Sequence, residues 1–246
     1  MMDLLVTISF FFLLWTSEVF ADNLFLNSTT PPALVGILAT GPLLDSAVAA
    51  DLVARIQRQC EQQNAFTAEF NQRLVNIASR EIEQRSGTFA FLKPHLVRWE
   101  TILPEKELVV AGEREVWDFF PAEGTAYRYT LEEMLHSKTM LRFISGKTRL
   151  DQDFYVKGQK VDASPASLIK LDLVPREPEP GLVQAYVWVD PATVLFKRVL
   201  IQDFYGNTND LEFSNLRPAA RLDKHLFIFS PPNSIQILDN FNSHKS

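Results

Sequence analysis

Hydrophobic positions recur at helical spacing in the segment that begins at Ser46. Charged and amide side chains such as Arg55, Arg58 and Gln59 occupy the other faces of the same segment. This spacing predicts an amphipathic helix of about four turns whose apolar stripe packs against a core. The residues of the stripe are Ala49, Leu52, Val53, Ile56 and Cys60.

The hydrophobic period changes from helical to alternating after Asn64. Phe66, Ala68 and Phe70 alternate with polar neighbours, which is typical of a strand with one buried face. Similar short segments follow at hairpin-length gaps, and they predict an antiparallel meander rather than a parallel sheet. These segments cover residues 80–92, 96–103, 106–111, 115–120, 125–131, 167–174, 182–189, 194–203, 207–213, 226–229 and 235–238.

A second helix is predicted at residues 137–145, where Met140, Phe143 and Ile144 fall on one face before Gly146 ends it. So much antiparallel sheet does not fit into one flat layer, so we expect it to curl into a barrel or an open half-barrel. Because 19 residues are Phe, the inner face of that sheet is expected to be apolar. The predicted fold class is therefore mainly β with helices (α+β), with the helices over the mouth of the curled sheet.

The N-terminus carries a secretion signal. An apolar run at residues 4–15 is followed by a small-residue site that ends at Ala21, so residues 1–21 are predicted to be a signal peptide. The run is shorter than the roughly 20 residues that span a bilayer, which makes an uncleaved anchor the less favoured alternative. Cleavage after Ala50 is a second candidate.

The rest of the chain is predicted to hold one linker and one domain. Residues 22–45 contain three prolines and two glycines, a composition that suits a flexible linker. A single domain is expected at residues 46–240, because 46% hydrophobic and 22% charged residues are ordinary for a globular protein. The net charge of -6 and the absence of a basic cluster in the sequence argue against a nucleic-acid partner.

Motifs that carry catalytic or metal chemistry are not found in the sequence. Gly146-Lys147-Thr148 is similar to the end of a phosphate-binding loop, but Leu141 stands where that loop needs a glycine. The histidines lack metal-ligand spacing, and the lone Cys60 excludes an internal disulfide and a multi-cysteine metal site. We therefore expect no metal, no cofactor and no enzymatic activity. A secreted hydrolase whose site assembles only in the fold is an alternative hypothesis.

Six short motifs between residues 51 and 238 follow one another in a characteristic order. They are Phe70-Asn71-Gln72, Ser86-Gly87-Thr88-Phe89, the segment 92–99 with Pro94 and Trp99, the pair 108–112 and 116–121, the segment 203–207, and the segment 227–232. In order and spacing they resemble the motifs F-x-Q, S-G-x-[FL], R-P-x-x-[FM]-R-W, V-S-D-G with L-W-x-Y-x-P, D-x-x-G-N and F-x-F-x-P-P of the LolA family.

This resemblance implies a fold and a function. Members of the family have an incomplete antiparallel barrel, or half-barrel, under a helical lid. They receive lipoproteins from an inner-membrane lipoprotein-releasing ABC complex and pass them to an outer-membrane lipoprotein acceptor. The implied function is a periplasmic, monomeric carrier that binds the acyl chains of lipid-modified proteins in a hydrophobic cavity. A carrier of small lipids or fatty acids, or a lipid-sensing regulator, on the same fold is the alternative.

The resemblance also implies which residues form the cavity and the lid. Lys93 stands where the family has an arginine that donates to backbone carbonyls of the lid; lysine keeps the charge but loses the planar fork. Plain packing is the alternative for the tryptophans and for the second helix, and a solvated charge is the alternative for Lys93. The implied ligand-binding residues are Phe70, Lys93, Val97, Trp99, Trp117, Met140, Phe143 and Ile144.

Overall fold

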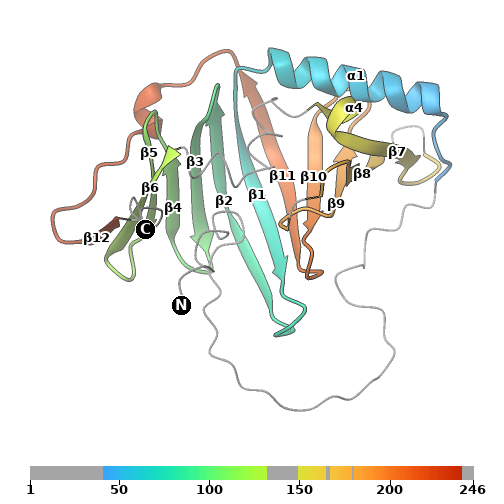
Figure 1. Ribbon diagram of the computed structural model, residues 1–246. Helices are drawn as coiled ribbons and strands as arrows, with labels where there is room; N and C mark the ends of the chain where they lie inside the picture. The colour runs from blue at the N-terminus through green and yellow to red at the C-terminus, as the bar shows by residue number, and fades with distance from the viewer. Residues whose placement is uncertain (1–40, 132–148, 165–166, 179, 240–246) are drawn as a thin grey trace.

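The computed structural model describes residues 41–131, 149–164, 167–178 and 180–239, which form one open β-sheet with a few short helices and one longer helix (Figure 1). In chain order the elements are α1 (Ser46–Gln62), β1 (Ala65–Val75), β2 (Ile82–Leu92), β3 (Leu96–Leu103), β4 (Glu107–Ala111), β5 (Glu115–Phe120), β6 (Thr125–Thr130), α4 (Leu150–Asp153), β7 (Phe154–Lys160), β8 (Ile169–Pro175), β9 (Gln184–Val189), β10 (Phe196–Gln202), β11 (Thr208–Ala219), η2 (Lys224–Phe227) and β12 (Gln236–Asp239).

All 12 strands of the described residues belong to one sheet, in the order β12-β6-β5-β4-β3-β2-β1-β11-β10-β9-β8-β7. Paired neighbours are antiparallel except β12, which runs parallel to β6. The central pair is β1 with β11, in register from Ala65 opposite Ala219 to Val75 opposite Thr208. This pair joins the meander β1–β6 to the meander β7–β11, so two halves that are distant in sequence form one surface.

The prediction of a mainly β fold with helices is confirmed. The helix predicted from Ser46 is α1, and the predicted segments other than 226–229 each coincide with a strand, although β11 continues six residues beyond its predicted end. The sequence pattern did not predict β7. The strand predicted at residues 226–229 is wrong, because η2 occupies Lys224–Phe227. The carboxylate of Asp223 accepts a hydrogen bond from the backbone N–H of His225 and so begins a helical turn there. The helix predicted at residues 137–145 lies outside the described residues.

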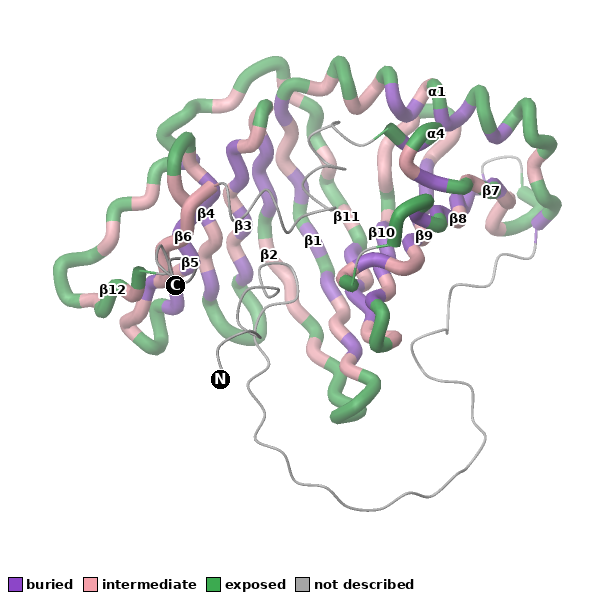
Figure 2. Tube along the Cα trace, viewed as in Figure 1, coloured by how far each residue is buried: buried purple, intermediate pink, exposed green. Residues whose placement is uncertain are grey.

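Alternation along the strands places two apolar clusters on one face of the sheet, named the inner face below. Along the middle of β1, buried positions alternate with exposed ones (Figure 2). The helix-side cluster packs α1 and α4 against β7–β10, and it includes Ile56, Leu171 and Val187. The aromatic cluster lies over β1–β5 and β11, and it contains Phe70, Phe89, Phe91, Val97, Trp99, Ala111, Val116 and Leu211.

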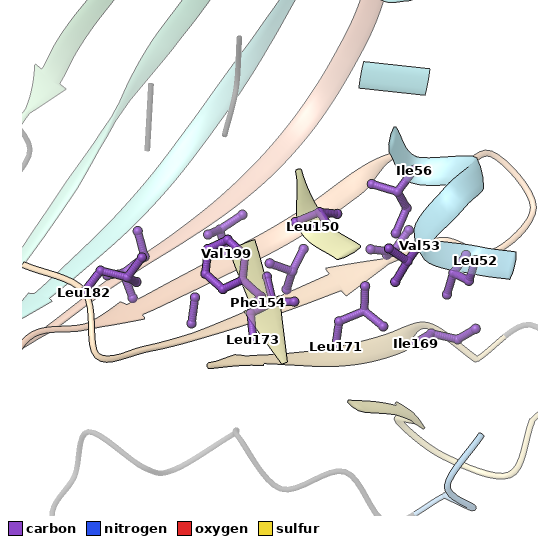
Figure 3. Close-up of a cluster of buried hydrophobic side chains, with 14 residues drawn as sticks. Leu52, Val53, Ile56, Leu150, Phe154, Ile169, Leu171, Leu173, Leu182 and Val199 are labelled. Atoms are coloured by element: carbon purple, nitrogen blue, oxygen red, sulfur yellow. The ribbon is translucent and has the colours of Figure 1, made fainter. Parts of the chain in front are cut away.

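Helix α1 is held on the β7–β10 half of the sheet by its apolar stripe. Side chains of Leu52, Val53 and Ile56 project from α1 toward the side chains of the strands (Figure 3). All three are buried, and full burial of such a side chain contributes roughly 1.5–3 kcal/mol. The stripe therefore determines which face of α1 packs against this half of the sheet.

A glycine permits the close approach of β2 and β3 next to the aromatic cluster. A Cβ atom on Gly87 would lie 1.9 Å from the carbonyl oxygen of Glu100 and 3.0 Å from the ring of Phe70. The ladder between β2 and β3 shifts register between Ser86 and Gly87, at the same place. Any side chain at position 87 would therefore push both β3 and the Phe70 ring away from β2.

Candidate functional site

An apolar pocket lies where the C-terminal end of α1 meets β1, β10 and β11 on the inner face. The space between its atoms is about 680 Å³ when the open solvent at its mouth is included. Only two amide side chains interrupt the apolar lining, those of Gln59 in α1 and of Gln63 directly after it. The other lining residues are Cys60, Phe66, Val194, Leu195, Phe196, Val199, Phe213 and Leu216.

Lys93 ties the C-terminal end of α1 to the turn between β2 and β3. Its Nζ donates to the carbonyl oxygen of Cys60 at 2.6 Å and to that of Glu61 at 2.7 Å. The last carbonyls of a helix have no intrahelical partner, and the negative end of the helix dipole also favours a cation there. The backbone N–H of Lys93 donates to the carbonyl of Asn64 at 2.8 Å. The side-chain and main-chain bonds of Lys93 together hold the rim of the pocket next to β2.

A second cation fixes α1 on the opposite side of the pocket. Nη2 of Arg55 donates to the carbonyl oxygen of Pro191 at 2.8 Å, in the turn between β9 and β10. Asp190 shapes that turn by accepting from the N–H of Ala192 at 2.9 Å, and this bond lowers the pKa of its carboxyl. The turn continues into Val194, which lines the pocket. Two cations bonded to main-chain carbonyls therefore hold α1 on the rim.

The pocket opens onto the aromatic cluster. Phe66 lines the pocket, and its ring lies 5.4 Å from Phe89 and 5.7 Å from Phe91 between centroids. Behind them, the ring of Trp99 is tilted against that of Phe70, with 4.5 Å between the ring centroids. The same ring meets Phe89 edge-on, with 5.2 Å between centroids. Such tilted aromatic pairs add stability beyond the area that they bury. The cluster gives the pocket a rigid wall.

The structure brings three of the sequence-predicted residues together and separates others. Phe70, Val97 and Trp99 are all buried in the aromatic cluster. Lys93 lies on the rim, as described above. Met140, Phe143 and Ile144 lie outside the described residues.

The expectation that Trp117 lines the same cavity is wrong. Successive residues of a strand point to opposite faces, and Val116 already faces the aromatic cluster. Trp117 instead packs on the outer face, with its ring 5.4 Å from Phe229 and its Nε1 donating to Glu115 at 2.8 Å. The guanidinium of Arg128 lies 5.3 Å from the same ring. Trp117 therefore stabilises the outer face.

The sequence does not reveal most of the residues that β10 and β11 contribute to the pocket. Phe213 lies opposite Phe70 in the ladder of β1 and β11, but its distance in sequence hides this pairing. Phe196 and Val199 reach the pocket through β10, the next strand. Phe66 could have been found, because it alternates in phase with Phe70 on the same strand.

The described residues offer no assembled centre for metal chemistry. Within the four described ranges, no group of three or more His, Cys, Asp or Glu side chains could hold a metal ion. No helix in the same ranges is long and apolar enough to cross a membrane. The chemistry that the pocket supports best is the binding of an apolar ligand.

The Cys60 thiol is expected to react slowly. It lines the pocket, and burial raises its pKa to about 11; the charge of Lys93 lowers this pKa by a smaller amount, and the charge of Glu61 raises it. Because the thiolate is the reactive form, alkylation by iodoacetamide at about pH 8 should be about two orders of magnitude slower than for a free cysteine. The rate should continue to rise above about pH 9. A rate that levels off at about pH 8.5, the ordinary pKa of a thiol, would contradict the buried position of Cys60.

Comparisons with known proteins relate the chain to one protein family and to a solved structure with the same fold. The family model described as outer membrane lipoprotein carrier protein LolA matches residues 61–230, which include β1–β11. An outer-membrane lipoprotein carrier protein of Shewanella pealeana is 25% identical over 178 residues, 72% of this chain and 80% of that protein. One of Methylococcus capsulatus is 25% identical over 189 residues, 76% of this chain and 87% of that protein. The crystal structure of an uncharacterized conserved protein from Thermus thermophilus shares the fold, with a TM-score of 0.51 at 16% identity, over 78% of this chain and 99% of its own.

Proposed function

The chain belongs to the LolA family of outer membrane lipoprotein carrier proteins, and from this premise we propose that its pocket binds the acyl chains of lipoproteins and carries them between membranes. The observation that carries the proposal is the apolar pocket, whose rim is a helix that two cations hold. Each methylene removed from water gains about 0.8 kcal/mol, so long acyl chains favour such a pocket strongly. A carrier must also release its cargo, which requires that closing the empty pocket competes with binding.

The open sheet acts in this proposal as a half-barrel under a helical lid. Helix α1 is the described part of the lid, since its apolar stripe covers the helix-side cluster and its end borders the pocket. Met140, Phe143 and Ile144 remain candidates for a second part of the lid. Ligand would enter between the end of α1 and the β2–β3 turn, which the hydrogen bonds of Lys93 hold together in the empty protein.

The proposed partners and location follow from the family. The cargo would be lipid-modified proteins, received from an inner-membrane lipoprotein-releasing ABC complex and delivered to an outer-membrane lipoprotein acceptor. We propose a monomeric, non-enzymatic periplasmic protein that needs no cofactor. In this organisation residues 1–21 are the signal peptide, residues 22–45 the linker and residues 46–240 the carrier domain.

Blocking the pocket should weaken acyl binding. Leu216 is half-buried on β11 and lines the pocket, so Leu216→Trp is expected to fill the space with an indole. An environment-sensitive dye should bind the unmutated protein and be displaced by a triacylated peptide. The variant should bind both at least roughly tenfold more weakly, a loss of about 1.4 kcal/mol.

The matched control is Val174→Trp, because Val174 is 40% exposed on β8 and does not line the pocket. This variant should bind dye and peptide like the unmutated protein. Equal affinity of the Leu216 variant, or an unmutated protein that binds neither ligand, would contradict the proposal. Displacement by free fatty acid but not by acylated peptide would favour the small-lipid alternative.

A further inference from the structure

A pair of carboxyl groups lies buried on the inner face, away from the pocket. Glu107 of β4 and Asp118 of β5 are 8% and 0% exposed. In the ladders, Glu107 lies opposite Thr101, and Asp118 lies opposite Val109. Because Val109 packs against the aromatic cluster, both acids share the face of that cluster. Buried ionisable groups need a specific partner for their charge.

The charges around the pair do not balance if both acids are ionised. Nη1 of Arg85 donates to Oε2 of Glu107 at 2.8 Å, while its Nε donates to Oε1 of Glu83 at 2.6 Å. One guanidinium is therefore shared by two carboxylates before Asp118 is considered. The hydrogen bonds of Arg85 go to Glu107 and Glu83, so one cation serves two carboxylates and acts on Asp118 through the longer-range field of its charge.

Glu107 is the acidic neighbour of Asp118 on the inner face. It lies two residues from Val109, which is opposite Asp118, so the two acids are diagonal neighbours in the β4–β5 ladder. Among the described residues, no N–H or O–H group of another side chain or of the backbone donates to either oxygen of Asp118. Two carboxylates cannot hydrogen bond unless one of them carries a proton, because an ionised carboxylate only accepts. A hydrogen shared with Glu107 would give the buried Asp118 carboxyl the bond that no described donor supplies.

We propose that Glu107 and Asp118 form a proton-binding site that holds one proton between the two side chains at neutral pH. Burial raises the pKa of Asp118 well above its ordinary value, and the adjacent charge of Glu107 raises it further. Burial also raises the pKa of Glu107, against the opposing effect of Arg85. The site thus binds its proton as a pair, as closely spaced carboxyl groups do.

The groups that face the pair come from the neighbouring strands and one turn. Arg85 and Glu83 belong to β2, and Thr101 faces Glu107 from β3. Tyr127 lies opposite Asp118 on β6, and Glu123 of the β5–β6 turn contributes a smaller unfavourable charge. Apart from Arg85, these neighbours are neutral or acidic, so the surroundings favour retention of the proton.

The site makes stability depend on pH in a defined direction. The folded protein binds this proton more tightly than the unfolded chain, whose carboxyl groups have pKa values of about 4. The stabilisation is therefore complete below about pH 4 and is lost as pH rises toward the raised pKa of the pair. An uncharged donor at position 118 should remove this dependence.

The experiment combines infrared spectroscopy with thermal unfolding of the full domain. At about pH 7 the unmutated protein should show the carbonyl-stretch band of a protonated carboxylic acid, which Asp118→Asn and Glu107→Gln should both abolish. The amide that Asp118→Asn introduces can still donate to Glu107. At about pH 8 this variant should therefore have a Tm roughly 3 °C or more above that of the unmutated protein, and its Tm should decrease less as the pH rises. Glu123→Gln, at an exposed carboxyl in the next turn, is the control and should keep both the band and the fall.

The proposal does not depend on acyl binding, because none of these measurements uses a ligand. A band that disappears in both pair variants and persists in the Glu123 variant supports the proton-binding site. Absence of the band in the unmutated protein at about pH 7 would overturn it, as would a band that survives in Asp118→Asn. A Tm for Asp118→Asn below that of the unmutated protein at every pH would also overturn it.

Discussion

Replacement of Lys93 by leucine is expected to leave cargo loading intact and to slow cargo release roughly tenfold. In the empty protein, Nζ of Lys93 holds the carbonyls of Cys60 and Glu61 and so keeps the end of α1 on the rim of the pocket. A charge-assisted bond of this kind contributes about 1.5 kcal/mol when one of its acceptors is open to solvent. Its loss favours the open state, which binds acyl chains more tightly. Release of acylated peptide to a vesicle acceptor measures the effect.

Lys93→Arg should restore release or make closure tighter, because a guanidinium can donate to two carbonyls at once. Cys60 reports the position of the helix independently, since its carbonyl is one of the acceptors and its thiol lines the pocket. In folded Lys93→Leu the thiol should become more accessible, and iodoacetamide should react faster with it than in the unmutated protein.

The matched control is Lys224→Leu, which removes an exposed lysine that pairs with Glu113 at 2.8 Å. This variant should load, release and react like the unmutated protein, because exposed ion pairs contribute little. Thermal unfolding must show that all three variants fold. If folded Lys93→Leu hands over its cargo at the unmutated rate, Lys93 is only a solvated charge at the end of β2.

The local elements could be predicted because each depends on a short pattern. The stripe of α1 and the alternation around Phe70 specify a helix and a strand without knowledge of the rest of the chain. Residues 226–229 form a short, wholly apolar run that also favours a strand, but the carboxylate of Asp223 begins a helical turn before a strand can form. Here a local side-chain bond to the backbone competes with the strand that the apolar run predicts.

The pocket could be predicted only in part because its walls meet through long-range pairing. Phe66 and Phe213 come from β1 and β11, and no periodic pattern reveals which strands are neighbours. The phase of alternation also decides toward which face of the sheet a side chain points. Val116 points to the inner face, so its neighbour Trp117 points to the outer face. The resemblance indicated Lys93, but only the fold identifies α1 as the helix that supplies the two carbonyls.

Phe70→Ala is expected to lower the free energy of unfolding by about 3–5 kcal/mol, the largest loss among single substitutions on the inner face. Phe70 is 1% exposed, and its ring lies 4.5 Å from that of Trp99. Truncation leaves a cavity under strands that Gly87 already brings close together, so the surroundings cannot collapse to fill it. Chemical denaturation with a fluorescence readout measures the change.

Phe66→Ala is the matched substitution, on the same strand and face but at the half-buried wall of the pocket. It should cost clearly less stability, because its ring already borders open space, and it should weaken dye and acyl-peptide binding more than stability. The two variants therefore separate the packed core from the ligand wall. If Phe70→Ala is nearly neutral for unfolding but weakens acyl binding like Phe66→Ala, then the aromatic cluster opens in solution and the cavity extends to Trp99, which would contradict its assignment as packed core.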